Sequence, residues 1–86
     1  MEIGNLIRMA NRIGQFFEAM PDRQEAGEGV ANHIHKFWEP RMRTQLLDFL
    51  AGQPDGEAGQ ETLHPLVREA VLQNRDRLTP AGRKPD

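Results

Sequence analysis

The three histidines are the first residues to consider for a metal or acid–base site, because imidazole ligates metals and titrates near neutral pH. His33 and His35 lie two residues apart, which on a helix places them about 200° apart around the axis, so they cannot hold one ion together. On a strand they would share a face, but the four-residue spacing of the neighbouring apolar residues argues against a strand. The sequence therefore predicts that His33 borders an apolar stripe, that His35 meets solvent or a partner, and that no metal is bound.

Side chains suited to nucleophilic catalysis are scarce. The chain has no cysteine, serine or tyrosine, which leaves threonines, lysines and carboxylates, none beside a recognisable activating base. Without cysteine, iron–sulfur ligation and thiolate zinc sites are excluded. Gly27 and Gly29 follow no strand and lack the remaining spacing of a Walker motif. We therefore expect no catalytic residue, no metal site and no cofactor site, and hence no enzyme acting alone.

An aromatic and basic corner is the strongest candidate for binding. Residues 37–43 combine the only tryptophan with two arginines and a methionine, types that are enriched at protein interfaces. Trp38 has two interpretations: it contacts a partner, or it caps the small core where two helices meet. Exposed methionine and phenylalanine on the first helix would extend such a surface. The predicted partner interface consists of Met9, Phe16, Trp38, Arg41, Met42 and Arg43.

These residues require helices to position them. From Ile3 to Met20 the apolar residues recur every three or four positions, which predicts an amphipathic helix. Met9 and Phe16 widen its apolar arc to about half the circumference. They pack either on a neighbouring helix of the same chain or on another subunit.

Three further helices are predicted. Asp22 caps the second helix, whose inward stripe is expected to end at Phe37. The two glycines of this helix either permit close helix contact or let its first turns fray. The third runs from Pro40 to about Ala51. The fourth begins near Pro65 and is capped by Thr62 or His64, with Leu66, Val67, Ala70, Val71 and Leu78 on its apolar stripe.

The remaining segments suggest the overall organisation. Residues 52–61 are rich in glycine and predict a flexible loop, and residues 79–86 predict a disordered tail. The fold class is therefore all-α: a small bundle of three to four short helices, forming a single domain over residues 1–78. The 86 residues carry a net charge of −2 and contain neither a membrane span nor a signal peptide, so we expect a cytoplasmic protein that binds no nucleic acid and no membrane.

Three segments carry a family resemblance: residues 6–13 (LIRMANRI) with Phe16 and Phe17, residues 30–34 (VANHI) with residues 37–43 (FWEPRMR), and residues 63–71 (LHPLVREAV). Together they resemble the delta subunit of soluble NAD-dependent formate dehydrogenases. The family often has serine or aspartate before the equivalent of Pro65, where this chain has His64, so capping there is expected to be weaker.

The resemblance implies a non-catalytic accessory subunit of an oxygen-tolerant, cytoplasmic, molybdenum-containing complex that oxidises formate to CO₂ and reduces NAD. In that family the catalytic subunit carries a bis-molybdopterin guanine dinucleotide metal centre and iron–sulfur clusters, while other subunits carry FMN and bind NAD. The implied role of this chain is to stabilise or assemble the complex. Our leading hypothesis is that the apolar arc of the first helix and the corner from Trp38 to Arg43 dock on the catalytic subunit.

Other functional hypotheses stay open at this point. A transient maturation factor would guard the catalytic subunit during cofactor insertion and then leave. A small helical nucleic-acid-binding protein is the distant alternative, because the corner and the C-terminal third contain several arginines. Self-association of the isolated chain also stays open.

Overall fold

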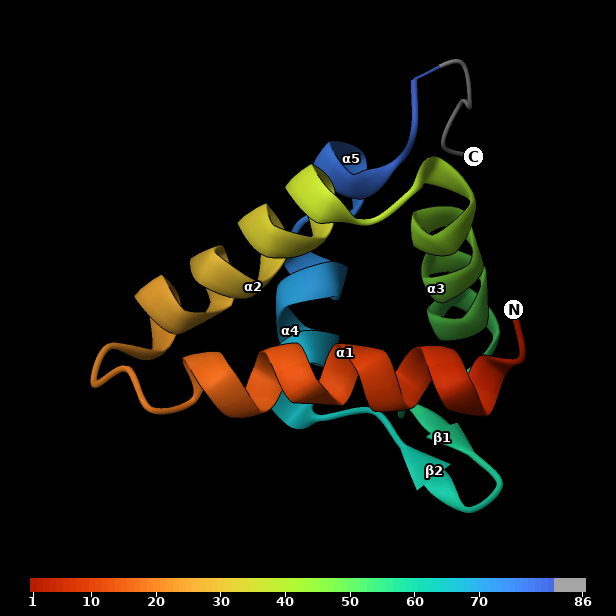
Figure 1. Ribbon diagram of the computed structural model, residues 1–86, viewed down its shortest axis with the longest axis horizontal. Helices are drawn as coiled ribbons and strands as arrows, with labels where there is room; N and C mark the ends of the chain where they lie inside the picture. The colour runs from red at the N-terminus through yellow and green to blue at the C-terminus, as the bar shows by residue number, and fades with distance from the viewer. Residues whose placement is uncertain (82–86) are drawn as a thin grey trace.

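Helices make up most of the structure, as the apolar periodicity predicts. The computed structural model describes residues 1–81, and the all-α prediction is confirmed for them (Figure 1). The elements, in chain order, are α1 (Ile3–Phe17), α2 (Arg23–Phe37), α3 (Pro40–Gly52), β1 (Glu57–Ala58), β2 (Glu61–Thr62), α4 (Pro65–Gln73) and α5 (Arg75–Leu78). No helix in this part of the chain is long and apolar enough to cross a membrane.

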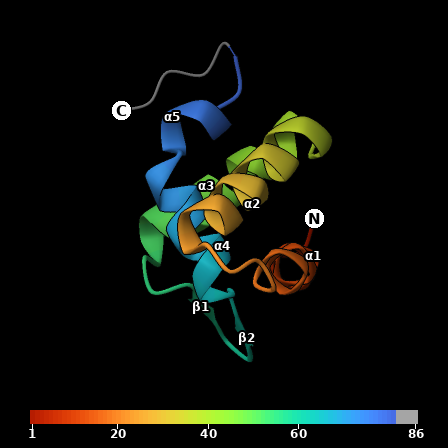
Figure 2. The ribbon, with the colours of Figure 1, turned by 90° about the vertical axis from the view of Figure 1, so that its left-hand side faces the viewer.

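Helix α4 lies at the centre of the fold. Helices α1, α2 and α3 form the sides of a triangle, and α4 lies in the middle of that triangle in Figure 1 and among the same helices in Figure 2. Its predicted stripe is confirmed, because Leu66, Val67, Ala70 and Val71 are all buried and Leu78 of α5 continues the stripe. Around them the other helices contribute Leu6, Ile7, Ala10, Ala26, Val30, Ala31, Ile34, Trp38, Leu46 and Leu50 to the core.

The helix ends follow local side-chain chemistry. Helix α1 ends at Phe17 and not at Met20, because Pro21 disfavours a helical conformation at Met20. Asp22 caps α2 as predicted: its Oδ1 accepts hydrogen bonds from the backbone N–H groups of Gln24 (2.8 Å) and Glu25 (3.2 Å).

His64, rather than Thr62, caps α4. Its Nδ1 accepts a hydrogen bond from the Leu66 N–H at 3.1 Å, which requires an unprotonated Nδ1. Its Nε2 faces the Glu18 carboxylate at 3.3 Å. The imidazole thus satisfies one free N–H group of the helix and also links α4 to the end of α1.

The segment predicted as a loop contains a short hairpin. Strands β1 and β2 pair antiparallel, with Glu57 opposite Thr62, and Gly56 and Gly59 supply the positive φ angles of 77° and 64°. Two-residue strands are too short to show alternation, which is why the sequence pattern did not reveal them. The hairpin is tied to α1 by the Arg8–Glu61 ion pair at 2.9 Å.

Thr79 and Pro80, the first residues of the predicted tail, are packed against the fold. The Thr79 hydroxyl donates a hydrogen bond to the Arg75 carbonyl at 2.7 Å, and Pro80 is buried. The packed part of the chain therefore continues to Pro80. Residues 82–86 of the predicted tail lie outside the described residues.

The two glycines of α2 give a matched test of helix packing. A Cβ at Gly29 would lie 2.5 Å from the Phe17 ring, whereas a Cβ at Gly27 would lie 3.9 Å from the nearest atom, the Ala70 Cβ. We expect Gly29→Ala to lower the free energy of unfolding by about 1–3 kcal/mol through overpacking. Gly27→Ala should raise it by up to about 1 kcal/mol through helix propensity. Urea titration of both variants tests this; equal effects would contradict it.

The cap at His64 predicts a second pair of outcomes. His64→Ala leaves the Leu66 N–H without its acceptor and should lower the free energy of unfolding by about 1 kcal/mol. His64→Asn restores a capping oxygen and should recover most of that loss, although it removes the contact with Glu18. Thermal unfolding followed by circular dichroism separates the two, and an asparagine variant no more stable than the alanine variant would argue against the cap.

Candidate interaction surface

Trp38 belongs to the core. It follows the last residue of α2, its side chain is only 8% exposed, and it packs in the same cluster as Leu46 and Leu50 of α3. Of the two interpretations of Trp38, the structure agrees with the core cap. Its indole is not an exposed anchor in this structure.

The other residues of the predicted interface do not form one surface. Met9 and Met42 are partly buried against the core, and Arg43 is partly buried with an Nε atom that has no hydrogen-bond partner within residues 1–81. Phe16 and Arg41 are exposed. The end of α1 that carries Phe16 and the start of α3 that carries Arg41 lie at different corners of the triangle (Figure 1).

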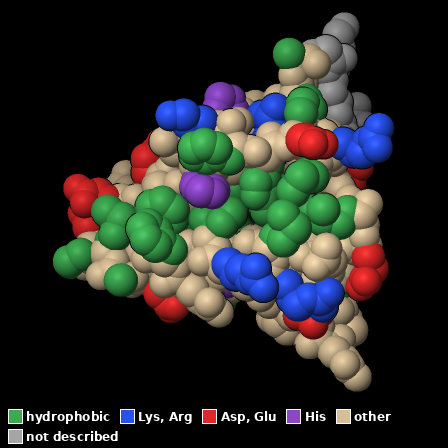
Figure 3. All heavy atoms as spheres, in the orientation of Figure 1, with side chains coloured by type: hydrophobic (Ala, Val, Ile, Leu, Met, Phe, Trp, Pro, Cys, Tyr) green, Lys and Arg blue, Asp and Glu red, His purple; other side chains and the backbone are tan. Residues whose placement is uncertain are grey.

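An exposed aromatic surface lies instead across α1 and α2. We call the side chains of Phe16, Phe17, His33 and Phe37 the aromatic ridge. The Phe16 and Phe17 rings meet edge to face with centroids 5.0 Å apart, Phe17 and His33 lie 6.4 Å apart, and His33 and Phe37 lie 4.9 Å apart. Phe16 is 74% exposed and Phe37 is 65% exposed. Figure 3 shows hydrophobic side chains running across this face of the molecule, with a histidine among them.

The exposure of Phe37 corrects the sequence prediction, which placed it on the inward stripe of α2. Ala26, Val30 and Ile34 are buried, and the next residue four positions on is Trp38. Trp38 therefore takes the inward position, and Phe37 turns outward beside His33. His33 borders the apolar surface and His35 is exposed, so both of those predictions are confirmed.

A shallow groove runs along one side of the ridge. It has a volume of about 400 Å³ and is lined by Arg12, Ile13, Phe16, Phe17 and His33. Apart from the guanidinium and the imidazole its lining is apolar, and it contains no carboxylate. The groove is thus suited to an apolar side chain with a negative group beside it.

Lysine and arginine accompany the ridge. Arg12 is exposed and forms no ion pair with any described residue, whereas Arg8 pairs with Glu61 and Arg23 pairs with Glu69. The Nζ of Lys36 lies 5.7 Å from the centroid of the Phe37 ring, a cation–π distance. Figure 3 shows lysine and arginine side chains on both sides of the hydrophobic band.

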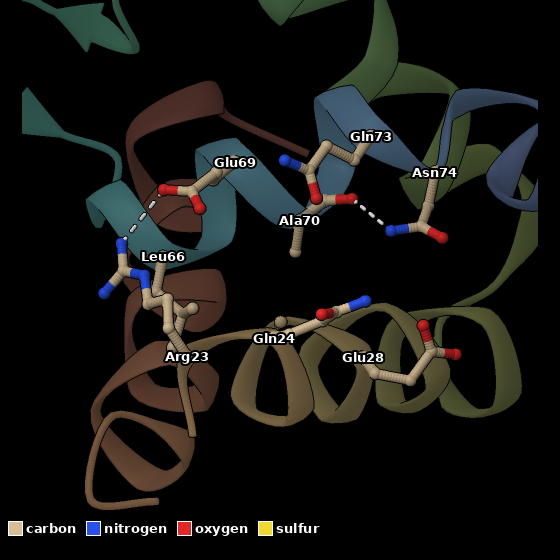
Figure 4. Close-up of a pocket in the computed structure, with 9 residues that line it drawn as sticks. Arg23, Gln24, Glu28, Leu66, Glu69, Ala70, Gln73 and Asn74 are labelled. Carbon is tan, nitrogen blue, oxygen red and sulfur yellow. Dashed lines mark hydrogen bonds and ion pairs between the residues drawn. The ribbon is translucent and has the colours of Figure 1, made fainter. Parts of the chain in front are cut away.

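A second hollow lies between α2 and α4 and has a volume of about 470 Å³ (Figure 4). Gln24 and Glu28 approach it from α2, while Gln73 and Asn74 approach it from the other side, and the Arg23–Glu69 ion pair at 3.1 Å lies at one end. Amides and charges of both signs give no preference for one ligand chemistry. Among the described residues no group of three or more histidine, aspartate or glutamate side chains could hold a metal ion.

Three members of the ridge were missed by the sequence analysis of the interface: Phe17, His33 and Phe37. Phe37 was expected on the inward stripe of α2, since a single sequence does not show which aromatic residue of a wide apolar arc remains exposed. The available signal was the spacing of His33 and Phe37, four residues apart on one helix face. Phe16 is the one predicted interface residue within the ridge.

Comparison with known proteins gives one match. A family model described as NADH-dependent formate dehydrogenase delta subunit FdsD matches residues 5–71, which include most of α1, all of α2, α3 and the hairpin, and most of α4. The whole aromatic ridge lies within the matched range. No curated protein and no solved structure matches the chain at a significant level.

The contrast between Trp38 and Phe16 predicts opposite effects on stability. Trp38→Ala removes a buried indole and should lower the free energy of unfolding by about 3–5 kcal/mol, enough to unfold much of so small a protein. Phe16→Ala removes an exposed ring and should cost less than about 1 kcal/mol. Denaturant titration of both variants measures the difference, and a stable Trp38→Ala protein would contradict the assignment of Trp38 to the core.

Proposed function

The chain belongs to the family of NADH-dependent formate dehydrogenase delta subunits, and from this premise we propose that it is a non-catalytic accessory subunit that stabilises the assembled enzyme. The proposed complex is cytoplasmic, contains molybdenum, and oxidises formate to CO₂ with NAD as the electron acceptor. The partners of the chain are then the other subunits of that complex, with the catalytic subunit as the one on which it docks.

Two exposed phenylalanine rings carry this proposal, because the family of this chain works as part of a complex. A small monomer gains nothing from leaving Phe16 and Phe37 in water, because each buried aromatic side chain contributes substantially to a core of limited size. Exposed apolar surface with charged neighbours is typical of a docking site.

The residues of this chain do not fit the cofactors of the complex. The sequence has no cysteine to ligate an iron–sulfur cluster, and the described residues provide no cluster of metal-ligating side chains. His33 contacts Phe37 within the ridge, and His64 caps α4. We therefore propose that the metal centre, the clusters, FMN and NAD all reside on the partner subunits.

The stabilising effect of such a subunit follows from mass action. A protein that binds only the folded, assembled partner raises the free energy of its unfolding or disassembly by an amount set by the ratio of its concentration to Kd. At about 100 times Kd this amounts to about 2.7 kcal/mol. No proton or electron transfer by this chain is needed for it to raise the yield of active enzyme.

Omitting the chain from the complex tests the proposal. When the other formate dehydrogenase subunits of the same source are co-expressed without it, we expect less assembled complex, and a melting temperature several degrees lower for what remains. Adding the purified chain back should restore stability and co-elute with active enzyme on size exclusion. Equal yield, activity and melting temperature without the chain would overturn the proposal, whereas activity restored without co-elution would favour a transient maturation factor.

A further inference from the structure

The aromatic ridge is organised before any partner binds. Its four rings form a continuous series of contacts from α1 to α2, and the Phe17 ring lies so close to Gly29 that no side chain would fit there. Phe17 and His33 form the middle of this series and Phe16 and Phe37 its two ends. A surface with fixed rings loses little conformational entropy on binding.

The charged side chains that line the groove or lie over a ring of the ridge are cations. Arg12 lines the groove, Lys36 lies over Phe37, and no carboxylate lines the groove. Among the described residues Arg12 and Lys36 form no ion pair, whereas Arg8, Arg23 and Arg77 pair with Glu61, Glu69 and Glu28. The two cations beside the ridge are therefore available to carboxylates of a partner.

We propose that the aromatic ridge binds an amphipathic, acidic segment of another subunit of the complex. An apolar side chain of that segment fills the groove between Ile13 and His33, and carboxylates before and after it pair with Arg12 and Lys36. This inference rests on the proposed function and adds to it the chemistry of the partner surface.

Charge complementarity favours this occupant over two others. In a symmetric pair of ridges, Arg12 and Lys36 of one copy would face the same cations of the other copy, which is unfavourable. Single-stranded nucleic acid also stacks on aromatic rings, but it needs a positive groove along several phosphates, and this chain has a net charge of −2. A protein segment with one or two carboxylates matches the two available cations.

Ridge variants within the complex test the inference. In the co-expressed complex, Phe16→Ala with Phe37→Ala should weaken retention of the chain at least about tenfold, since aromatic anchors dominate interfaces. Arg12→Glu with Lys36→Glu should weaken it by a similar factor, and by more at low salt than at high salt. Arg75→Glu makes the same type of charge change on α5, which contributes no residue to the ridge or to the groove, and should leave retention unchanged. Circular dichroism confirms that each variant is folded.

A photoreactive phenylalanine analogue at position 16 identifies the occupant directly. Crosslinking to a peptide of another subunit that contains an apolar residue with aspartate or glutamate within one helical turn supports the inference. Crosslinking to a second copy of the chain, or to a basic segment, overturns it. Binding of a single-stranded oligonucleotide also overturns the inference if the ridge variants lose that binding but are retained in the complex as tightly as the wild-type chain.

The outcomes separate the two proposals. If the wild-type chain does not associate with the other subunits, the proposed function fails and the inference fails with it. If the wild-type chain and Arg75→Glu associate, and the ridge variants associate equally tightly, only the ridge inference is overturned.

Discussion

The fold depends on the close approach of α1 to the start of α4. A Cβ at Gly14 would lie 2.8 Å from the His64 ring and 2.9 Å from Val67, so the two helices meet at a distance that only glycine permits. One turn away, the Asn11 side chain donates to the Thr62 carbonyl at 2.9 Å and accepts from the His64 N–H at 2.7 Å. This junction places α4 in the centre of the triangle and fixes the hairpin that leads into it. Because the same end of α1 carries Phe16 and Phe17, the junction also determines where the ridge lies.

The packing around α4 bears on which aromatic rings are exposed. The core includes the aliphatic stripe of α4, Trp38 and aliphatic residues of α1, α2 and α3, and no phenylalanine is among its fully buried residues. Phe17 is partly buried where Gly29 offers no side chain, and Phe16 and Phe37 remain exposed. A partner that covers the exposed rings would add to the limited burial that a chain of this size provides.

Helix ends and apolar stripes could be predicted from the sequence, whereas the packing of individual aromatic side chains could not. The cap at Asp22, the break at Pro21 and the stripe of α4 follow from residue types and spacing alone, whereas the sequence left the cap of α4 open between Thr62 and His64. The choice between Phe37 and Trp38 does not: relative to Ile34 they are rotated by about 60° and about 40° in opposite directions around the helix axis, so both border the inward face. The position of α3 decides between them by packing Leu46 and Leu50 in the same cluster as Trp38. Of the corner of residues 37–43, Trp38 is therefore used by the core, while Phe37 remains exposed.

The charge of the whole chain and the charge of the ridge have opposite signs, and this difference bears on specificity. A net charge of −2 gives no long-range attraction to nucleic acid or to anionic surfaces. Arg12 and Lys36 act only at short range, within about the 8 Å over which charges remain unscreened at physiological salt. A partner therefore gains from them only after its apolar side chain has reached the groove, where the carboxylates come close enough to pair. In the proposed interaction the rings then provide the affinity, and the two cations select which apolar segment is accepted.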